Sequence, residues 1–141
     1  MPDSFHLDSR LEQDTIAVAS WPLCELRMMN DAQYPWLILI PRVEGATELF
    51  HLSEAQRQQL DKESMHLSKG LMLAFNGLKL NVAALGNVVS QLHIHHVVRF
   101  EGDPTWPAPV WGKLPPVPLD EDALQARFAR LQTLLQDFSG E

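Results

Sequence analysis

The first third of the chain contains two apolar stretches separated by a polar turn, which is the pattern of a β-hairpin. Residues 24–29 alternate loosely between apolar and polar side chains, whereas residues 36–40 are all apolar and lie between two prolines. Asn30 and Asp31, which both favour turns, lie between the two stretches. We therefore predict two strands joined by a turn, preceded by a further short strand at residues 15–19.

A long amphipathic helix is predicted after Ser53. Ser53 is a favourable N-cap residue, and Gln56 three positions later completes a capping-box pattern. Four apolar residues fall on one helical face: Leu60, Leu67, Leu71 and Phe75. Asn76 and Gly77 follow and are expected to end the helix, because both residue types tolerate a left-handed backbone.

The second half of the chain predicts two more strands, a loop and a final helix. Residues 79–85 and residues 91–100 are strand candidates, and the second is rich in valine and isoleucine. Residues 104–119 form a loop with six prolines, which excludes a helix or a central strand. A terminal helix is predicted over residues 120–139, with Asp120 as its cap. Its apolar residues are Leu124, Phe128, Leu131, Leu135 and Phe138.

This order of elements predicts an α+β fold. The strands follow one another with one long helix inserted and another at the end, and no regular βαβ alternation occurs. Residues 8–14 predict one or two helical turns before the first strand. The chain of 141 residues suits a single domain that spans residues 1–141.

The acidic charge balance narrows the range of functions. A formal net charge of −7 argues against binding to duplex nucleic acid, because such proteins need a basic face. A small phosphate ligand remains compatible with that charge, since a few local donors can hold one phosphate. The single cysteine, Cys24, excludes an intrachain disulfide and indicates a reducing compartment. With no signal peptide or bilayer-spanning stretch recognised, we expect a cytoplasmic protein without membrane contact.

A cluster of histidines marks the candidate functional segment. On a strand, side chains alternate between the two faces of the sheet. One face of the strand predicted at residues 91–100 therefore carries Gln91, His93, His95, Val97 and Arg99. The opposite face is mostly apolar and is expected to pack on the core beneath the long helix. His96 lies on that apolar face, which favours a structural role for it.

The row of polar side chains can surround one phosphate group. An unprotonated imidazole is a nucleophile near neutral pH, and it can attack phosphorus to give a covalent phosphoramidate. A second histidine and an amide on the same face can hold the non-bridging oxygens as charge develops. Two alternatives stay open: ordinary hydrogen-bonded strand histidines, and a zinc site made of His93, His95 and one further ligand.

The segment from Gly86 to Asp103 resembles the signature of the histidine-triad (HIT) superfamily. That signature is His-φ-His-φ-His-φ-φ, where φ is apolar, commonly after a glycine–glutamine pair and often followed by an arginine. The segment is most similar to a bacterial subgroup with the pattern Leu-Gly-Asn-Val-Val-x-Gln-Leu-His-x-His. Residues 26–30, residues 35–42, the predicted long helix and residues 106–112 resemble the same subgroup.

The resemblance allows two registers for the triad. In the first, Gln91, His93 and His95 occupy the three positions; in the second, His93, His95 and Val97 do. We prefer the first because it also aligns Arg99 with the family's continuation. It implies that His93 is the nucleophile and that His95 contacts the phosphate, with Gln91 where the first histidine usually stands.

This register departs from the family pattern at two positions. Gln91 can form hydrogen bonds but cannot act as an acid or base, so substrate positioning is expected to survive while proton delivery to the leaving group is in question. His96 replaces an apolar residue, which leaves it a structural role or a role at the leaving group.

The resemblance also implies nucleotide-binding residues outside the triad. Asn30 would contact the ribose, Gly86 and Asn87 would lie near the phosphates, and Arg99 belongs to the motif's continuation. Each has a structural alternative: a turn for the two asparagines, a positive φ for Gly86, and a surface ion pair with Asp103 for Arg99.

The family fold implied is an antiparallel sheet of about five strands with the nucleophile on its exposed face, and members usually pair as homodimers.

The implied function is a nucleotide hydrolase or transferase that attacks an α-phosphate through a nucleotidyl-histidine, with no cofactor and no metal. The partner would be a small-molecule nucleotide. A non-catalytic nucleotide-binding module is the main alternative, and a zinc-binding protein is the remaining one. Trp36 is expected in the core, and Trp106 and Trp111 are expected to pack over the sheet or at a subunit edge.

Overall fold

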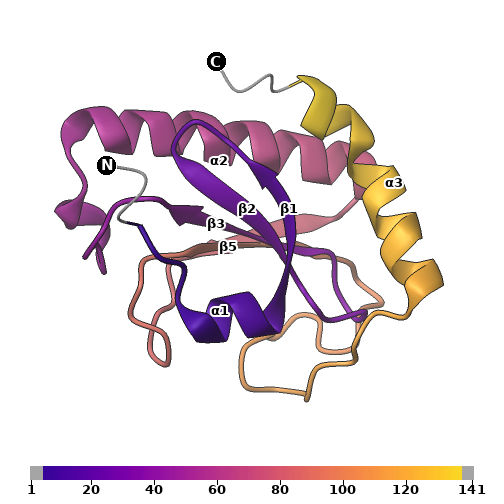
Figure 1. Cartoon of the computed structure of the whole chain (residues 1–141). Helices are drawn as coiled ribbons and strands as arrows, with labels where there is room; N and C mark the ends of the chain where they lie inside the picture. The colour runs from indigo at the N-terminus through magenta and orange to yellow at the C-terminus, as the bar shows by residue number, and fades with distance from the viewer. Residues whose placement is uncertain (1–4, 138–141) are drawn as a thin grey trace.

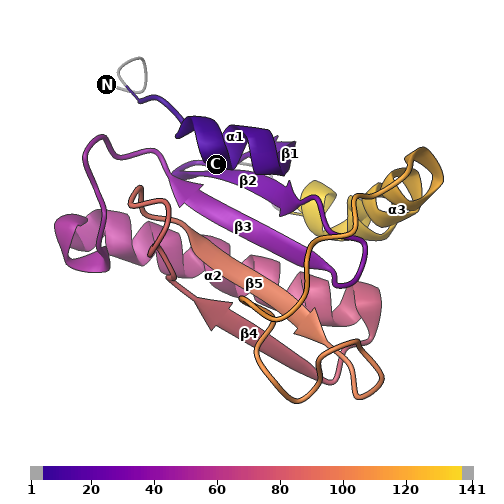
Figure 2. The ribbon, with the colours of Figure 1, turned by 90° about the horizontal axis from the view of Figure 1, so that it is seen from below.

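A computed structural model describes residues 5–137 as one antiparallel sheet with helices on both of its faces (Figure 1). The sheet has five strands in the order β1-β2-β3-β5-β4 (Figure 2). The elements are α1 (Ser9–Asp14), β1 (Thr15–Ser20), β2 (Cys24–Met29), β3 (Trp36–Pro41), the short 3-10 helix η2 (Leu49–His51), α2 (Glu54–Phe75), β4 (Lys79–Ala83), β5 (Ile94–Arg99) and α3 (Glu121–Asp137). The predicted α+β class is confirmed.

The local signals at the ends of the long helix act as the sequence predicted. The backbone N–H of Gln56 donates to Ser53 Oγ at 3.1 Å, and the N–H of Ser53 donates to Gln56 Oε1 at 2.8 Å. Asn76 adopts a left-handed conformation with φ of 52° and ends α2. The hairpin of β2 and β3 is also confirmed by antiparallel pairing from Cys24↔Pro41 to Met28↔Leu37.

Two strands are shorter than predicted. β4 ends at Ala83 rather than residue 85, and β5 begins at Ile94 rather than residue 91. The pairing between β3 and β5 starts only at Leu39↔Ile94. Before that point, the N–H of Leu92 donates instead to the carbonyl of Ala46 in the loop after β3. Residues 91–93 are therefore a structured connection beside the sheet rather than part of it.

The alternation along β5 divides the molecule into two apolar layers. Ile94 and Val98 point toward α2 and join the larger cluster, which lies between the sheet and the two long helices. Val97 points to the opposite face and joins a smaller cluster with Trp36 and Ile38. α1 and the proline-rich loop of residues 104–119 cover this second face (Figure 1).

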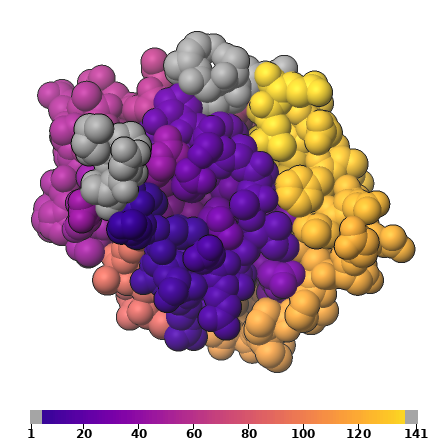
Figure 3. Space-filling model, in the orientation of Figure 1, coloured from indigo at the N-terminus to yellow at the C-terminus, as the bar shows by residue number. Residues whose placement is uncertain are grey.

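The C-terminal helix α3 lies on the outside of the molecule (Figure 1). α3 packs against α2 and borders the N-terminal elements on one face of the molecule (Figure 3). Asp120 caps α3 by accepting the N–H of Ala123 at 2.8 Å, as predicted. The last residues of the predicted helix, 138 and 139, lie outside the described part. Within residues 5–137, no helix combines the length and apolar character needed to cross a bilayer.

Candidate active site

His93 lies just before β5 with its ring fixed by its own backbone neighbourhood. The side chain is 5% exposed, and its Nδ1 is 2.7 Å from the carbonyl oxygen of Gln91. A carbonyl oxygen only accepts hydrogen bonds, so Nδ1 carries the proton and donates it. The neutral ring therefore has its lone pair on Nε2, which is the nitrogen available as a nucleophile.

His95 lies beside His93 in the opposite tautomer. The two ring centroids are 4.8 Å apart. The indole Nε1–H of Trp36 donates to His95 Nδ1 at 3.0 Å, so the proton of the neutral His95 ring is on Nε2. Burial, together with the neighbouring His93, lowers the pKa of His95 from 6.5 to about 4. His95 is therefore a neutral hydrogen-bond donor at pH 7.

The two imidazoles line a cavity that adjoins a larger one. The histidine cavity has a volume of about 220 Å³ and also contacts Leu85 and Val89. The larger cavity, of about 490 Å³, has apolar walls that include Trp36 and Val110. The two cavities adjoin, because they share four lining residues: Arg10, Asp14, Met29 and Trp111.

His96 faces the other side of the sheet, as the alternation predicted. It is fully buried, its Nδ1 donates to the carbonyl of Ile94 at 3.1 Å, and its Nε2 accepts from Ser64 Oγ of α2 at 2.8 Å. Burial lowers the pKa of His96 to about 4. Because one ring nitrogen bonds to the backbone of β5 and the other to Ser64 of α2, His96 joins β5 to α2. A leaving-group role on the His93 side is excluded by this position.

The Gln91 amide was expected to face a phosphate, but in the structure it bonds to the backbone of another segment. Its Oε1 accepts the backbone N–H of Asp8 at 2.9 Å, and its Nε2 donates to the carbonyl of His6 at 2.9 Å. The side chain thus binds the N-terminal segment, defined here as residues 5–14. Since residue 91 precedes β5, the strand alternation does not govern its direction, and the predicted row of three polar groups is reduced to His93 and His95.

Three of the other residues predicted near the nucleotide line the cavities of the site. Asn30 lines the larger cavity, and its Oδ1 accepts the N–H of Leu119 at 2.9 Å. Asn87 lines the histidine cavity and, together with Gly86, Gln91 and His93, a further cavity of about 220 Å³. Gly86 has no positive φ, contrary to its structural alternative. A Cβ at Gly86 would instead lie 2.9 Å from the carbonyl oxygen of Val89, so the residue permits a close backbone approach beside His93.

The structure gives Arg99 a different role from the predicted ones. It is 1% exposed, so the ion pair with Asp103 is buried and not a surface pair, and the predicted contact with nucleotide is corrected. Its guanidinium donates to Asp103 at 2.8 Å, to Asn81 Oδ1 at 2.9 Å and to Thr105 Oγ1 at 3.2 Å. Burial would raise the pKa of Asp103, but the hydrogen bonds from Arg99 and nearby backbone N–H groups lower it. Arg99 therefore fixes the start of the proline-rich loop to β4 and β5.

Two features of the site were not predicted from the sequence. Trp36 was expected in the core, without a bond from its N–H to His95, although Ile38, two residues along β3, pairs with His95. The N-terminal segment, which reaches the site through Gln91, had no predicted role. The strand register could have suggested the first contact. No local pattern could have suggested the second, because its partners are 83 residues apart in the sequence.

No group of three metal-ligating side chains of the kind that holds a metal ion occurs in residues 5–137. The zinc-binding alternative needed a third ligand beside His93 and His95, and this part of the chain offers none.

The fold and the site define an α+β protein whose single antiparallel sheet carries a paired-histidine site at one face. The sequence model of the HIT domain matches residues 10–102. This chain belongs to the HIT domain family.

Solved structures with similar sequences support the same assignment. A histidine triad protein from Marinobacter aquaeolei VT8 is 50% identical, with a TM-score of 0.92, over 96% of this chain and 98% of that one. A histidine triad (HIT) protein from Sinorhizobium meliloti 1021 is 41% identical, with a TM-score of 0.91, over 94% and 98%. A histidine triad protein from Bradyrhizobium japonicum is 42% identical, with a TM-score of 0.89, over 92% and 96%. A search of curated proteins finds no match to this chain.

Proposed function

We propose that this protein is a nucleotide hydrolase or transferase in which His93 attacks the α-phosphate of a nucleoside polyphosphate or phosphoramidate. The observation that carries the proposal is the pair of imidazoles that line one cavity. The neutral His93 ring has its lone pair on Nε2, and His95 carries its proton on Nε2, where a hydrogen bond with the Leu85 backbone would give way to a phosphate oxygen. A phosphoryl group between them would meet a nucleophile and a donor for its non-bridging oxygens.

The adjoining cavities suit the two parts of a nucleotide. The larger cavity, of about 490 Å³, is within the size range of small-molecule sites and has apolar walls for a base. Asn30 lines the larger cavity and would contact the ribose, and Asn87 lines the histidine cavity and would contact the phosphates. The tautomers also favour His93 over His95 as the nucleophile, because Trp36 holds His95 as a donor.

The reaction proceeds in two displacements. The lone pair on His93 Nε2 forms a bond to the α-phosphorus while the bond from phosphorus to the leaving oxygen or nitrogen breaks. The leaving group departs with that electron pair and takes a proton from solvent, since the Gln91 amide cannot supply one. Water, or an acceptor alcohol or amine, then attacks phosphorus and loses a proton to solvent. The phosphorus–nitrogen bond breaks, its electrons return to Nε2, and the nucleoside monophosphate or its ester or amide is released.

The test is the His93→Ala protein, assayed beside the wild type on dinucleoside polyphosphates, nucleoside phosphoramidates and aminoacyl adenylates. We expect wild-type turnover of at least one substrate class, loss of monophosphate release in His93→Ala, and a nucleotidyl adduct on His93 by mass spectrometry of quenched wild type. His51→Ala, which removes an exposed histidine on η2, is the matched control and should retain turnover. Equal turnover by wild type and His93→Ala would reject the nucleophile.

One observation favours a second function, nucleotide binding without catalysis. Both polar atoms of the Gln91 amide are bound to the N-terminal segment, so the usual first histidine is replaced by a group engaged elsewhere. Calorimetry with adenosine and guanosine monophosphates separates the two functions, because binding without turnover of any substrate class supports the second. The homodimer and the cytoplasmic location remain predictions.

A further inference from the structure

The site handles an anion but holds little positive charge. Burial and the neighbouring His93 lower the pKa of His95 to about 4, so this imidazole carries no charge at pH 7. The other ionisable side chains on the walls of the two adjoining cavities are Arg10, Asp14 and Asp31. Among the described residues that line these cavities, Arg10 is the one arginine or lysine, in a protein whose net charge is −7.

Arg10 stands where the two cavities meet. It lines both of them, together with Asp14 from the same turn of α1. Its ion pair with Asp14 is long, at 3.7 Å from Nε to Oδ2, and the two side chains are 65% and 50% exposed. An exposed pair of this kind contributes little stability, so the guanidinium can exchange the carboxylate for a phosphate at low cost. Arginine also matches the geometry of phosphate oxygens through its paired N–H groups.

The position of Arg10 depends on the hydrogen bonds made by Gln91. The Gln91 amide holds the backbone of His6 and Asp8, and Asp8 Oδ1 then caps α1 by accepting the N–H of Arg10 at 2.8 Å. The carbonyl of the same Gln91 accepts from His93 Nδ1. Gln91 therefore joins two parts of the site, the imidazole of His93 through its backbone and the turn that carries Arg10 through its side chain.

We propose that Arg10 binds a phosphate group of the nucleotide at the junction of the two cavities, and that Gln91 is a positioning residue that holds the N-terminal segment and Arg10 in place. This inference rests on the proposed function, since it takes a nucleotide as the ligand. It assigns to residue 91 a structural contact with the N-terminal segment in place of a contact with phosphate.

Calorimetry with adenosine and with adenosine monophosphate separates contact with the phosphate from support of the cavity wall. Arg10→Glu should weaken binding of the monophosphate by about tenfold or more, as the loss of a charge-assisted contact predicts, and leave adenosine binding unchanged. Lys62→Glu makes the same change of net charge on an exposed residue of α2, on the far side of the sheet, and should change neither affinity. The preference of the wild type for the monophosphate should shrink as salt is raised, because salt screens an exposed charge.

Gln91 variants test the positioning role with a different pattern. Gln91→Ala should weaken adenosine and the monophosphate alike and speed amide hydrogen exchange in residues 6–12, because the N-terminal segment is released. Gln91→Glu keeps the acceptor for the N–H of Asp8 but loses the donor to His6, so its exchange rate should fall between wild type and Gln91→Ala. Unchanged exchange in Gln91→Ala would overturn the positioning role.

Three other results would overturn the phosphate contact of Arg10 or the proposed function itself. Equal losses for adenosine and the monophosphate in Arg10→Glu, or a similar loss in Lys62→Glu, would overturn the phosphate contact. If the wild type binds the monophosphate and Arg10→Glu binds it as well, only this inference fails. If the wild type binds neither ligand nor any of the polyphosphate and phosphoramidate substrates, the proposed function fails and this inference fails with it.

Discussion

At the scale of single residues, the site depends on which nitrogen of each histidine carries the proton. His93 and His95 have the same side chain, yet one presents a lone pair and the other an N–H to the same cavity. The difference comes from their neighbours: a backbone carbonyl accepts from His93 Nδ1, whereas the Trp36 indole donates to His95 Nδ1 and the Leu85 backbone bonds to the same His95 ring. Trp36 is thus a positioning residue for His95 as well as part of the core.

Trp36→Phe tests this assignment. The substitution keeps an aromatic ring but removes the donor to His95 Nδ1, so the proton of His95 can move to Nδ1 and Nε2 ceases to donate. We expect turnover to fall by about tenfold, in line with the loss of one buried hydrogen bond. Nitrogen-15 NMR of the imidazoles should show the change of tautomer at His95.

Trp111→Phe is the matched control for that variant. Its indole also packs edge-on against His95, with ring centroids 5.4 Å apart compared with 5.7 Å for Trp36. The buried Trp111 Nε1 has no hydrogen-bond partner, so its removal should leave the His95 tautomer unchanged. A change of tautomer in both variants, or in neither, would contradict the role given to Trp36.

At the scale of elements, β5 places two adjacent histidines in different environments. His95 faces the cavity, while His96 faces α2 and bonds to Ser64. Alternation of side chains along a strand is sufficient to separate them. The same element therefore serves the site on one face and anchors the long helix on the other.

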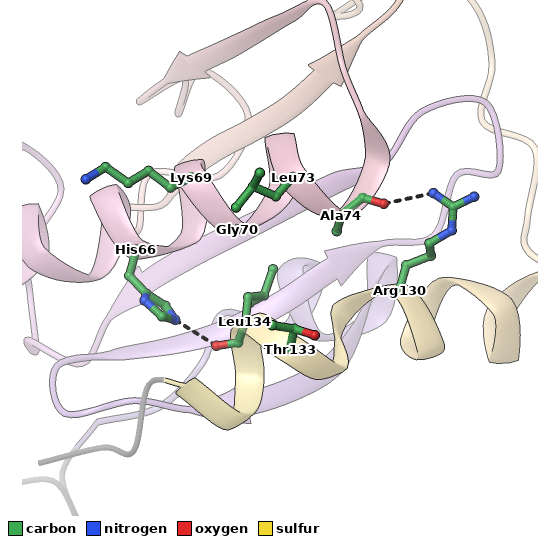
Figure 4. Close-up of a pocket in the computed structure, with 8 residues that line it drawn as sticks. All are labelled: His66, Lys69, Gly70, Leu73, Ala74, Arg130, Thr133 and Leu134. Atoms are coloured by element: carbon green, nitrogen blue, oxygen red, sulfur yellow. Dashed lines mark hydrogen bonds between the residues drawn. The ribbon is translucent and has the colours of Figure 1, made fainter.

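The packing of α2 on α3 depends on a glycine in the interior of α2. A Cβ at Gly70 would lie 2.6 Å from the Cβ of Leu134 in α3, which is closer than two carbon atoms can approach. On either side of this contact, the His66 ring bonds to the carbonyl of Leu134, and Arg130 donates to the carbonyl of Ala74 (Figure 4). The absence of a side chain at residue 70 is what lets the two helices approach.

Gly70→Ala is therefore expected to destabilise the protein. Alanine favours a helix over glycine by about 1 kcal/mol, but here the added methyl group forces α2 and α3 apart, which costs about 1–3 kcal/mol. We expect a net loss of stability in urea unfolding followed by circular dichroism. A variant more stable than the wild type would contradict this expectation. It would show that the gain in helix propensity is larger than the cost of crowding between α2 and α3.

At the scale of the whole molecule, two buried neutral histidines link stability to pH. His95 and His96 each have a pKa lowered from 6.5 to about 4, mainly by burial. Above pH 6.5 both are neutral in the folded and unfolded chain. As pH falls below 6.5 toward 4, the unfolded chain takes up protons that the folded chain excludes, and the folded state loses stability.

Urea unfolding between pH 7.5 and pH 5 should measure this loss. Each histidine contributes a slope of about 1.4 kcal/mol per pH unit within the window from about 6.5 to about 4. His96→Leu removes one of the two groups, so its slope should be smaller than that of the wild type even though its stability at pH 7.5 also changes. An identical slope in the two proteins would show that His96 does not resist protonation in the fold.

The sequence by itself determined the elements and their faces. The capping box at Ser53, the end of α2 at Asn76 and the opposite directions of His95 and His96 follow from interactions within a few residues, which local patterns encode. The motif around His93 is equally local, and it is the central part of the resemblance to the HIT family. None of these features depends on how distant parts of the chain meet.

Only the tertiary structure decided the partners of the polar groups. Gln91 binds backbone 83 and 85 residues away, and Trp36 reaches across 59 residues to set the tautomer of His95. Arg99 is buried because the proline-rich loop folds back over it, with the Trp106 ring 5.4 Å from its guanidinium. A buried polar group takes whichever partner the folded chain brings within hydrogen-bond distance, and residue spacing does not specify that partner.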